Sequence, residues 1–176
     1  MRIKYLAAIA ALIFSGAAHA EDFRLQSPAF QANGAMPQKY TCEGDNVSPP
    51  LIWSGVPGGT QSLALIVDDP DAPDPAKPTK DVSHWVLYNV RPAADKLEAA
   101  TSLPSGAAEG LNEKGEAEYM GPCPPIGKHR YFFRLYALNS TLDFHEPPTR
   151  AAVEQAIKGH MLRMTSLVGT YEKAKK

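Results

Sequence analysis

The stretch GPCPPIGKHRYFFRLYAL, Gly121–Leu138, decides the fold because a stiff turn leads directly into a long apolar segment. The turn has three prolines, two glycines and a cysteine in seven residues, and proline fixes φ and removes a backbone donor. Tyr131–Leu138 is rich in aromatic residues, which favour a packed strand. Side chains alternate between the faces of a strand, so His129 and Tyr131 share one face and Arg130 lies on the other. The sequence therefore predicts a rigid rim and a strand that presents an imidazole and a phenol to the same wall.

The rest of the chain predicts a single, mainly β domain. Sixteen prolines and 13 glycines are spread between short apolar runs, which is typical of strands joined by structured loops. Neither an internal repeat nor a change of composition marks a second domain, so we expect one domain over residues 21–176. The expected strands are Phe23–Gln26, Leu51–Trp53, Ser62–Val67, His84–Val90, Tyr131–Leu138 and a last edge strand at Leu167–Tyr171.

One helix is predicted near the C-terminus. Thr149 follows two prolines and is a good N-cap. A stripe of apolar residues follows at i, i+4, i+8 and i+11, and it predicts a helix packed against the core. His160 lies beside this stripe and is expected to be half-buried. The stripe consists of Val153, Ile157, Met161 and Met164.

The first twenty residues predict a secretory signal peptide. Arg2 and Lys4 precede the apolar run Leu6–Phe14, and Ala18-His19-Ala20 forms a small-x-small cleavage pattern. Removal of residues 1–20 leaves 156 of the 176 residues, with 16 basic against 19 acidic side chains, a net charge of −3 in place of −1. This mild acidity argues against a nucleic-acid partner. We therefore expect a periplasmic or secreted protein.

The two cysteines, Cys42 and Cys123, predict a disulfide bond. An even pair in an exported protein is best interpreted this way. The bond closes a loop of about 80 residues and is worth roughly 4–5 kcal/mol in the chain-entropy description. Two alternatives are a pair of buried free thiols and a nucleophilic Cys123 with His129 as its base.

A second group of polar residues lies where a strand is expected to end, and two motifs together resemble a known family. Asp69-Pro70-Asp71-Ala72-Pro73 is followed by His84 and then by the glycine-proline turn that leads to His129-Arg130-Tyr131. This order resembles the phosphatidylethanolamine-binding protein family, and within it the bacterial branch of Raf-kinase-inhibitor-like proteins. Asp45–Pro57 and Leu167–Tyr171 resemble the same branch, so the resemblance covers essentially the whole mature chain.

The resemblance implies a Greek-key arrangement of antiparallel sheets with one or two short helices. It also implies a small pocket for a phosphate-containing small molecule or a phospholipid head group, with cis peptide bonds near the prolines and no cofactor. Asp71, Gly121 and Gly127 are expected to support the pocket. The ligand-binding residues implied by the motif positions are Asp69, His84, Pro122, His129 and Tyr131.

Such a pocket would bind an anion through hydrogen-bond donors. His84 and His129 can each donate an N–H to a phosphate oxygen, and the hydroxyl of Tyr131 is a third donor. Asp69 is expected to accept a proton from one of the histidines and favour its imidazolium form. Arg130, on the opposite face, is expected in a structural ion pair. With little fixed positive charge, the site should bind weakly at neutral pH, and an ethanolamine head group, which carries both signs, suits it.

Two further function classes stay open at the sequence level. The chain has no G-x-S-x-G, H-E-x-x-H or glycine-rich phosphate loop, so we expect no catalysis, although a weak hydrolase is one alternative. Asp69, His84 and His129 are also a chemically possible metal-ligand set, which we rank below anion binding. The other alternative is an inhibitor or interaction module for an envelope or extracellular protein, with specificity in loops 75–81 and 99–119. The resemblance also allows a homodimer.

Overall fold

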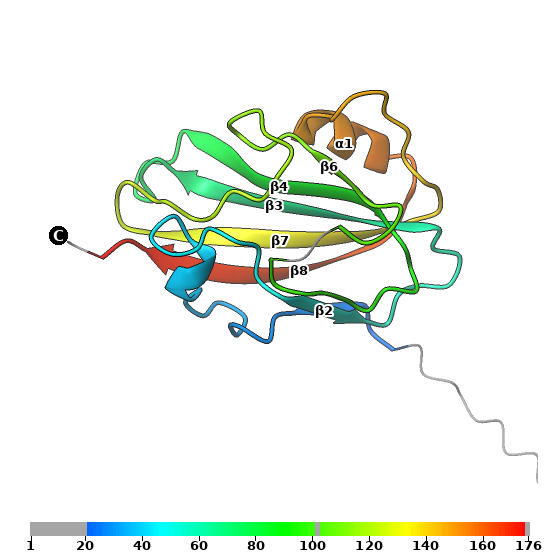
Figure 1. The fold of residues 1–176 in the computed structure, drawn as a ribbon, viewed down its shortest axis with the longest axis horizontal. Coiled ribbons are helices and arrows are strands. Elements are labelled where there is room, and N and C mark those ends of the chain that lie inside the picture. Colours follow the sequence, from blue (N-terminus) through cyan, green and yellow to red (C-terminus); the bar gives the residue numbers. More distant parts are fainter. Residues whose placement is uncertain (1–20, 101–102, 175–176) are drawn as a thin grey trace, which may run out of the picture.

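The computed structural model describes residues 21–100 and 103–174, which fold into two antiparallel sheets packed face to face (Figure 1). The expected signal peptide, residues 1–20, lies outside the described residues. No helix of the described part is long and apolar enough to cross a membrane.

The larger sheet has five strands in the order β6-β4-β3-β7-β8. All neighbours in it are antiparallel. The chain leaves β6 at one edge and returns across the sheet to pair β7 with β3, as in a Greek key. This arrangement confirms the expected mainly β fold, and it places Leu167–Tyr171 in the edge strand β8. The strands are β3 (Ser62–Ala72), β4 (Lys80–Val90), β6 (Ala108–Gly110), β7 (Lys128–Leu138) and β8 (Met161–Glu172).

The smaller sheet covers one face of the larger one and encloses the main core. It has the order β1-β2-β5, with β1 at Arg24–Gln26, β2 at Leu51–Ser54 and β5 at Lys96–Leu97. β3, the central strand of the larger sheet, is buried on both faces, which explains its continuous apolar run. Alternate side chains of β7, among them Tyr131 and Phe133, point into this core, as the alternation predicted.

The opposite face of the larger sheet is covered in part by helix α1, Arg150–Ile157. Thr149 is its N-cap, as expected, and its side chain accepts a hydrogen bond from the backbone N–H of Ala152 at 3.3 Å. Val153 and Ile157 are buried in a second apolar cluster against the sheet.

The predicted helix was too long. It ends at Ile157, and Met161 and Met164 lie on β8 with 51% and 46% of their surface exposed. β8 pairs with β7 over its whole length, and these inter-strand hydrogen bonds override the helical spacing of four apolar residues. His160 is exposed in the turn before β8, where its Nδ1 contacts Oδ1 of Asn139 at 3.1 Å, so the half-buried position expected for it was wrong.

The strands that carry the motif residues are longer than expected. β3 continues through the acidic segment to Ala72, and β4 begins at Lys80, four residues before His84. The peptide bond between Ala72 and Pro73, just after β3, is cis. Asp69 and His84 are therefore held inside the sheet rather than on loops beyond it.

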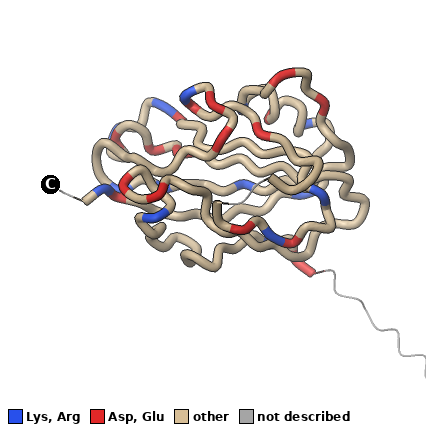
Figure 2. The backbone as a smooth tube through the Cα atoms, in the orientation of Figure 1, with Lys and Arg blue, Asp and Glu red and all other residues tan. Residues whose placement is uncertain are grey.

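The loops that meet these strand ends gather at one end of the molecule. In Figure 1, β3 ends and β7 begins at one end of the molecule. The short helix η1 (Gln38–Tyr40) and the C-terminus of the chain lie at this same end, whereas α1 lies near the other end. Acidic and basic positions are interspersed over the backbone in this view (Figure 2). The motif residues thus meet at an end of the sheet that is built from loops of both halves of the chain.

Candidate ligand-binding pocket

A cavity of about 310 Å³ lies where β3 ends and β4 begins. Segments far apart in the sequence form its walls: the N-terminal segment around Cys42, the strands β3 and β4, and the loop that leads into β7. Its lining residues are Cys42, Asn46, Asp69, Ala72, Val82, His84, Lys114, Met120, Gly121, Cys123, Pro124, Pro125 and His129.

Asp69 and His129 form a buried contact at the inner wall of the pocket. Nδ1 of His129 lies 2.7 Å from Oδ2 of Asp69, and the two side chains are 0% and 5% exposed. Nε2 of His129 lies 3.0 Å from the carbonyl oxygen of Ile126. Both ring nitrogens therefore face oxygen atoms. When the ring carries two protons, Nδ1 donates to an ionised Asp69 and Nε2 donates to the carbonyl of Ile126. The expectation that Asp69 orients a histidine is confirmed in its geometry. The expectation that His129 offers an N–H to a ligand stays a prediction, because in this structure both of its nitrogens contact oxygens of the protein.

The second oxygen of Asp69 is also occupied. Oδ1 accepts the backbone N–H of Asp71 at 2.9 Å, and Asp71 in turn accepts from Nε and Nη2 of Arg130 at 2.9 and 2.7 Å. Hydrogen bonds from the Arg130 side chain hold the pKa of Asp71 below its usual range, against the effect of burial. Arg130 lies on the other face of β7 from His129, so its expected role in a structural ion pair is confirmed. Asp71 supports the site and does not line it.

His84 enters the pocket through a β-bulge. Val67 pairs with Trp85 and Asp68 with Ser83, so His84 is an extra residue on β4. The bulge lets His84 and Trp85 face the same side of the sheet, although they are consecutive. The ring of His84 lies edge-on against Tyr131, with 5.1 Å between the ring centroids.

The hydrogen bonds of His84 fix its tautomer. Nδ1 lies 2.7 Å from the carbonyl oxygen of Met120, which can only accept, so Nδ1 carries the proton. Burial lowers the pKa of His84 below its usual value, while the Met120 carbonyl and nearby Asp69 and Glu113 oppose this effect. The ring is therefore neutral at neutral pH. Its Nε2 makes no hydrogen bond with any described residue and offers a lone pair to the pocket.

Tyr131 and Pro122 lie behind the pocket wall. Tyr131 is 0% exposed, and its hydroxyl makes no hydrogen bond of normal geometry with a described residue. Burial raises the pKa of Tyr131, and the negative charge of nearby Asp69 raises it further. The carbonyl oxygen of Pro122 accepts the backbone N–H of Cys42 at 3.1 Å. Gly127 stands at the turn before β7 with φ of 70°, a conformation that favours glycine. Of the predicted residues, Asp69, His84, Gly121 and His129 line the cavity, and Tyr131, Pro122 and Gly127 do not.

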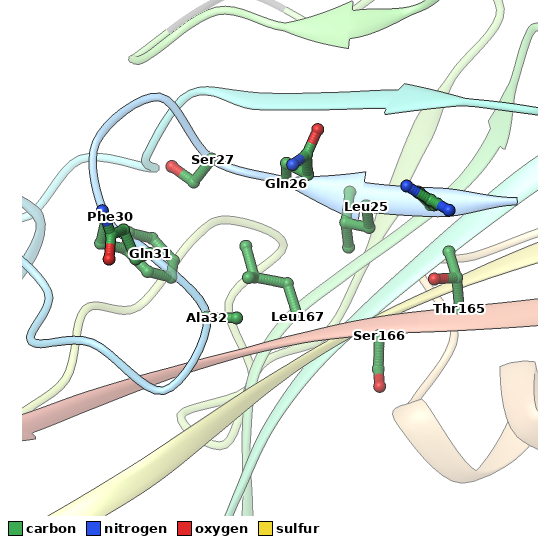
Figure 3. A pocket seen from close by; sticks show the side chains of 10 residues that line it. Leu25, Gln26, Ser27, Phe30, Gln31, Ala32, Thr165, Ser166 and Leu167 are labelled. Atoms are coloured by element: carbon green, nitrogen blue, oxygen red, sulfur yellow. The ribbon is translucent and has the colours of Figure 1, made fainter. Parts of the chain in front are cut away.

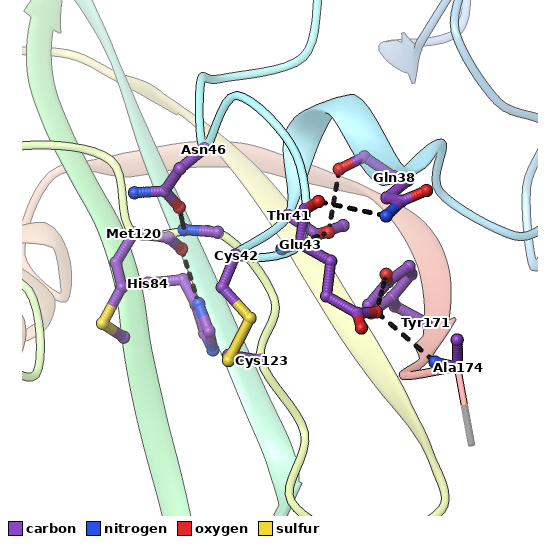
Figure 4. The surroundings of a disulfide bond; sticks show 11 residues. Gln38, Thr41, Cys42, Glu43, Asn46, His84, Met120, Cys123, Tyr171 and Ala174 are labelled. Carbon is purple, nitrogen blue, oxygen red and sulfur yellow. Dashed lines mark hydrogen bonds between the residues drawn. A yellow bond between two sulfur atoms is a disulfide. The ribbon is translucent and has the colours of Figure 1, made fainter. Parts of the chain in front are cut away.

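The outer wall of the pocket is tied to the N-terminal segment (Figure 4). Cys42 and Cys123 form the expected disulfide, with 5.4 Å between their Cα atoms and a sequence separation of 81. Beside it, the N–H of Gly121 donates to Oδ1 of Asn46 at 2.9 Å. A Cβ atom on Gly121 would lie 2.6 Å from this oxygen, so only glycine fits here. The hydroxyl of Tyr119 donates to the carbonyl of Tyr40 at 2.9 Å. The wall is thus fixed before any ligand binds.

Two polar pocket residues, Asn46 and Lys114, were missed by the sequence analysis. Asn46 lay in the segment that resembles the family but was not singled out there. Lys114 lay in the loop assigned to protein specificity, yet this exposed residue is among those that line the cavity and brings there a positive charge that the sequence seemed to lack. As for the alternative metal site, the described residues contain no group of three or more His, Cys, Asp or Glu that could hold a metal ion.

A second cavity, of about 390 Å³, lies between β1 and β8 (Figure 3). Two of its polar side chains are paired within the protein: Arg24 pairs with Asp22 at 3.1 Å, and the hydroxyl of Ser27 donates to the carbonyl of Pro50 at 2.7 Å. Figure 3 shows that Ser166 points to the far side of β8, away from Leu25 and Leu167. The residues that line this second cavity include no histidine, in contrast to the pocket beside His84.

Comparisons with known proteins agree with the fold and the motifs. A sequence model of the phosphatidylethanolamine-binding proteins matches residues 26–172. A UPF0098 protein of Methanothermobacter thermautotrophicus is 47% identical over 153 residues, which cover 85% of this chain and 98% of that protein. The crystal structure of a Chlamydia trachomatis phosphatidylethanolamine-binding protein homolog is similar with a TM-score of 0.80 at 41% identity, covering 86% of this chain and 98% of that one. Escherichia coli YbcL, described as a member of the mammalian family, has a TM-score of 0.79 at 30% identity, covering 88% and 100% of the two chains.

The unpaired hydroxyl of Tyr131 gives a test of the buried site. We expect Tyr131→Phe to change the free energy of unfolding by less than about 1 kcal/mol, because the hydroxyl makes no hydrogen bond of normal geometry and its nearby acceptor, Asp69, keeps its other partners. The matched variant Tyr119→Phe should cost about 1–3 kcal/mol, since it leaves the carbonyl of Tyr40 without its partner. Urea denaturation measures both. A larger loss for Tyr131→Phe than for Tyr119→Phe would show that the Tyr131 hydroxyl has a partner in solution.

The lowered pKa of His84 predicts a loss of stability in acid. Between the folded-state pKa and the usual value of 6.5, the unfolded chain binds more protons at this residue, so the free energy of unfolding rises with pH. The contribution of neutral His84 to the free energy of unfolding is fully present above pH 6.5 and is lost as the pH falls through the folded-state pKa of this residue. His84→Asn keeps a donor for Met120 but cannot be protonated, and its stability should vary less with pH across this window. Thermal denaturation from about pH 7.5 to pH 5 checks this, with His145→Asn, at an exposed histidine, as the control; equal slopes for wild type and His84→Asn would contradict the assignment.

Proposed function

This chain belongs to the phosphatidylethanolamine-binding protein family, and we propose that it binds a small phosphate-containing ligand in the pocket beside His84. The ligand is a phosphorylated small molecule or the phosphate-bearing head group of a phospholipid, and the protein holds it without converting it chemically. The observation that carries the proposal is a preformed cavity into which one buried imidazole presents an unoccupied nitrogen.

The shape of the pocket supports a small ligand. Its volume of about 310 Å³ is at the lower end of the range of small-molecule sites. The disulfide and the hydrogen bonds around Gly121 hold the outer wall, and the Asp69–His129 contact holds the inner one. A wall that is ordered before binding loses little conformational entropy when a ligand enters.

The chemistry of His84 supports a ligand that carries both acceptors and a donor. Neutral His84 has a lone pair at Nε2 and accepts a hydrogen bond from a protonated phosphate oxygen or from an ammonium group. The second pKa of a phosphate monoester is about 6, so mild acid supplies such a protonated oxygen. Where His84 itself takes up a proton, Nε2 becomes a donor to an anionic oxygen. Both routes strengthen binding of a phosphate monoester as the pH falls.

Binding without turnover is supported by the bonds that the side chains of Cys123, His129 and Asp69 already make within the protein. Cys123, which could have served as a nucleophile, is bonded to Cys42. His129, its candidate base, is engaged through both ring nitrogens, and both oxygens of Asp69 accept hydrogen bonds. These groups stabilise the pocket, so none of them is available to activate a water molecule or a hydroxyl group.

The proposal includes export. The apolar run and the small-x-small pattern in residues 1–20 support a cleaved signal peptide, and a disulfide suits an oxidising compartment. We expect the protein recovered from the periplasm of a bacterial host to begin at Glu21, as read by mass spectrometry. Recovery of only the uncleaved chain from the cytoplasm would contradict this part of the proposal.

The ligand proposal is tested by backbone NMR titration with inorganic phosphate, phosphoethanolamine and glycerophosphoethanolamine. We expect shifts at Gly121 and Val82, a Kd on the order of 1 mM near neutral pH, and tighter binding at about pH 5.5. Val82→Phe fills part of the cavity and should abolish the shifts, whereas Val168→Phe, at another half-buried strand valine outside the pocket, should not.

The three ligands separate the two sources of the phosphate group. Binding of the diester glycerophosphoethanolamine points to a phospholipid head group, and binding of the other two alone points to a small phosphorylated molecule. Equal binding by wild type and Val82→Phe, or no shift with any ligand at tens of millimolar, would contradict the proposal and favour an interaction module instead.

A further inference from the structure

The loop that carries Lys114 is a rigid turn built around Asn112. The side chain of Asn112 is buried, and its Oδ1 accepts the backbone N–H groups of Lys114 and Glu116 at 2.8 and 3.1 Å. Its Nδ2 donates to the carbonyl of Glu118 at 3.1 Å, and Gly115 has φ of 79°. Hydrogen bonds from one buried amide to three positions fix the backbone of the loop, so the Cα of Lys114 is held beside the pocket.

The charge of Lys114 is not neutralised by the acidic residue next to it. Glu113 pairs with Lys80 at 2.5 Å, and its backbone N–H donates to the carbonyl of Ser83 at 2.8 Å, which ties the loop to β4. Among the described residues, no carboxylate lies within ion-pair distance of Lys114. Asp69, the carboxylate that lines the same cavity, is paired with His129. Lys114 therefore brings an unpaired positive charge to the pocket.

Asn46 adds a free donor to the same cavity. Its Oδ1 accepts the N–H of Gly121, so its Nδ2 is the end of the amide that remains for a ligand. In Figure 4 the dashed line from Asn46 starts at its side-chain oxygen and not at this nitrogen. Because the neutral ring of His84 offers an acceptor rather than a donor, the pocket has one acceptor at Nε2 of His84 and two donors at Lys114 and Asn46.

We infer that Lys114 and Asn46 form the anion-selecting part of the pocket, where the ammonium group and the amide nitrogen bind the phosphate oxygens of the ligand. This inference rests on the proposed function and assigns the phosphate to two residues that are not among the ligand-binding residues implied by the resemblance. His84 then binds a donor of the ligand, such as a protonated oxygen or an ammonium group. The pocket thereby prefers ligands that carry a phosphate over the same amine without one.

The inference is tested by isothermal titration of phosphoethanolamine and inorganic phosphate into wild type and Lys114→Gln. We expect Lys114→Gln to weaken binding of both about 10-fold, the loss typical of a hydrogen bond to a charged group. In wild type, affinity should fall as NaCl rises from about 0.05 M to about 0.5 M, and Lys114→Gln should remove most of this dependence. Lys114→Arg should retain binding. Lys158→Gln removes the same charge next to α1, far from the pocket, and should bind as wild type does.

Asn46→Asp tests the second donor. The new side chain keeps an oxygen for the N–H of Gly121 and tolerates the positive φ of 56°, but it replaces the free donor with an anionic oxygen. We expect phosphate binding to fall at least about 10-fold, since a repulsion replaces a hydrogen bond. Ethanolamine, a cation without phosphate, is the control ligand: neither substitution should weaken its binding.

The failures are distinguishable. If wild type binds phosphoethanolamine and Val82→Phe does not, the proposed function stands; equal affinity and equal salt dependence in wild type and Lys114→Gln would then overturn the inference alone. If wild type binds none of the ligands, the proposed function fails and the inference fails with it.

Discussion

The buried contact between Asp69 and His129 is the constraint on which the rest of the site depends. It joins the central strands β3 and β7 through two side chains that are almost completely removed from solvent. A carboxylate at such a position needs hydrogen-bond partners, because an unpaired buried charge is strongly destabilising. The ring of His129 and the backbone N–H of Asp71 supply them. As a consequence, the polar groups most deeply placed in the site are used for structure, and His84 and residues of the surrounding loops are left to face the cavity.

The position of His84 and the position of the loops have separate physical causes. The bulge in β4 turns His84 toward the side of the sheet on which Tyr131 and Trp85 lie, and its hydrogen bond to Met120 leaves Nε2 as the ring nitrogen without a partner among the described residues. The wall opposite is held by the Cys42–Cys123 disulfide and by the close approach of Gly121 to Asn46. The strands therefore fix the positions of the side chains at the inner wall of the pocket, and the disulfide-linked loops fix the positions of those at the outer wall.

Much of this could be predicted from the sequence, because the strongest signals were local. The period-two alternation of β7 separates His129 from Arg130, and the even pair of cysteines predicts the disulfide. The features that the sequence did not predict depend on contacts between residues far apart in the sequence. Pairing with β7 converts Met161 and Met164 from an expected helix to an edge strand. The extra residue that turns His84 follows from the register of two strands, and Lys114 and Asn46 reach the pocket only because the loops that carry them are folded against it.

The central claim is that His129 is a structural residue and His84 the histidine that meets the ligand. A long-range proton–nitrogen correlation spectrum of histidine-labelled protein, recorded with and without phosphoethanolamine, tests it most directly. The account requires His84 to carry its proton on Nδ1 with a bare Nε2 whose signal moves when ligand is added, while both nitrogens of His129 remain unchanged. A response confined to His129, or a His84 ring protonated on Nε2 alone in the free protein, would contradict it.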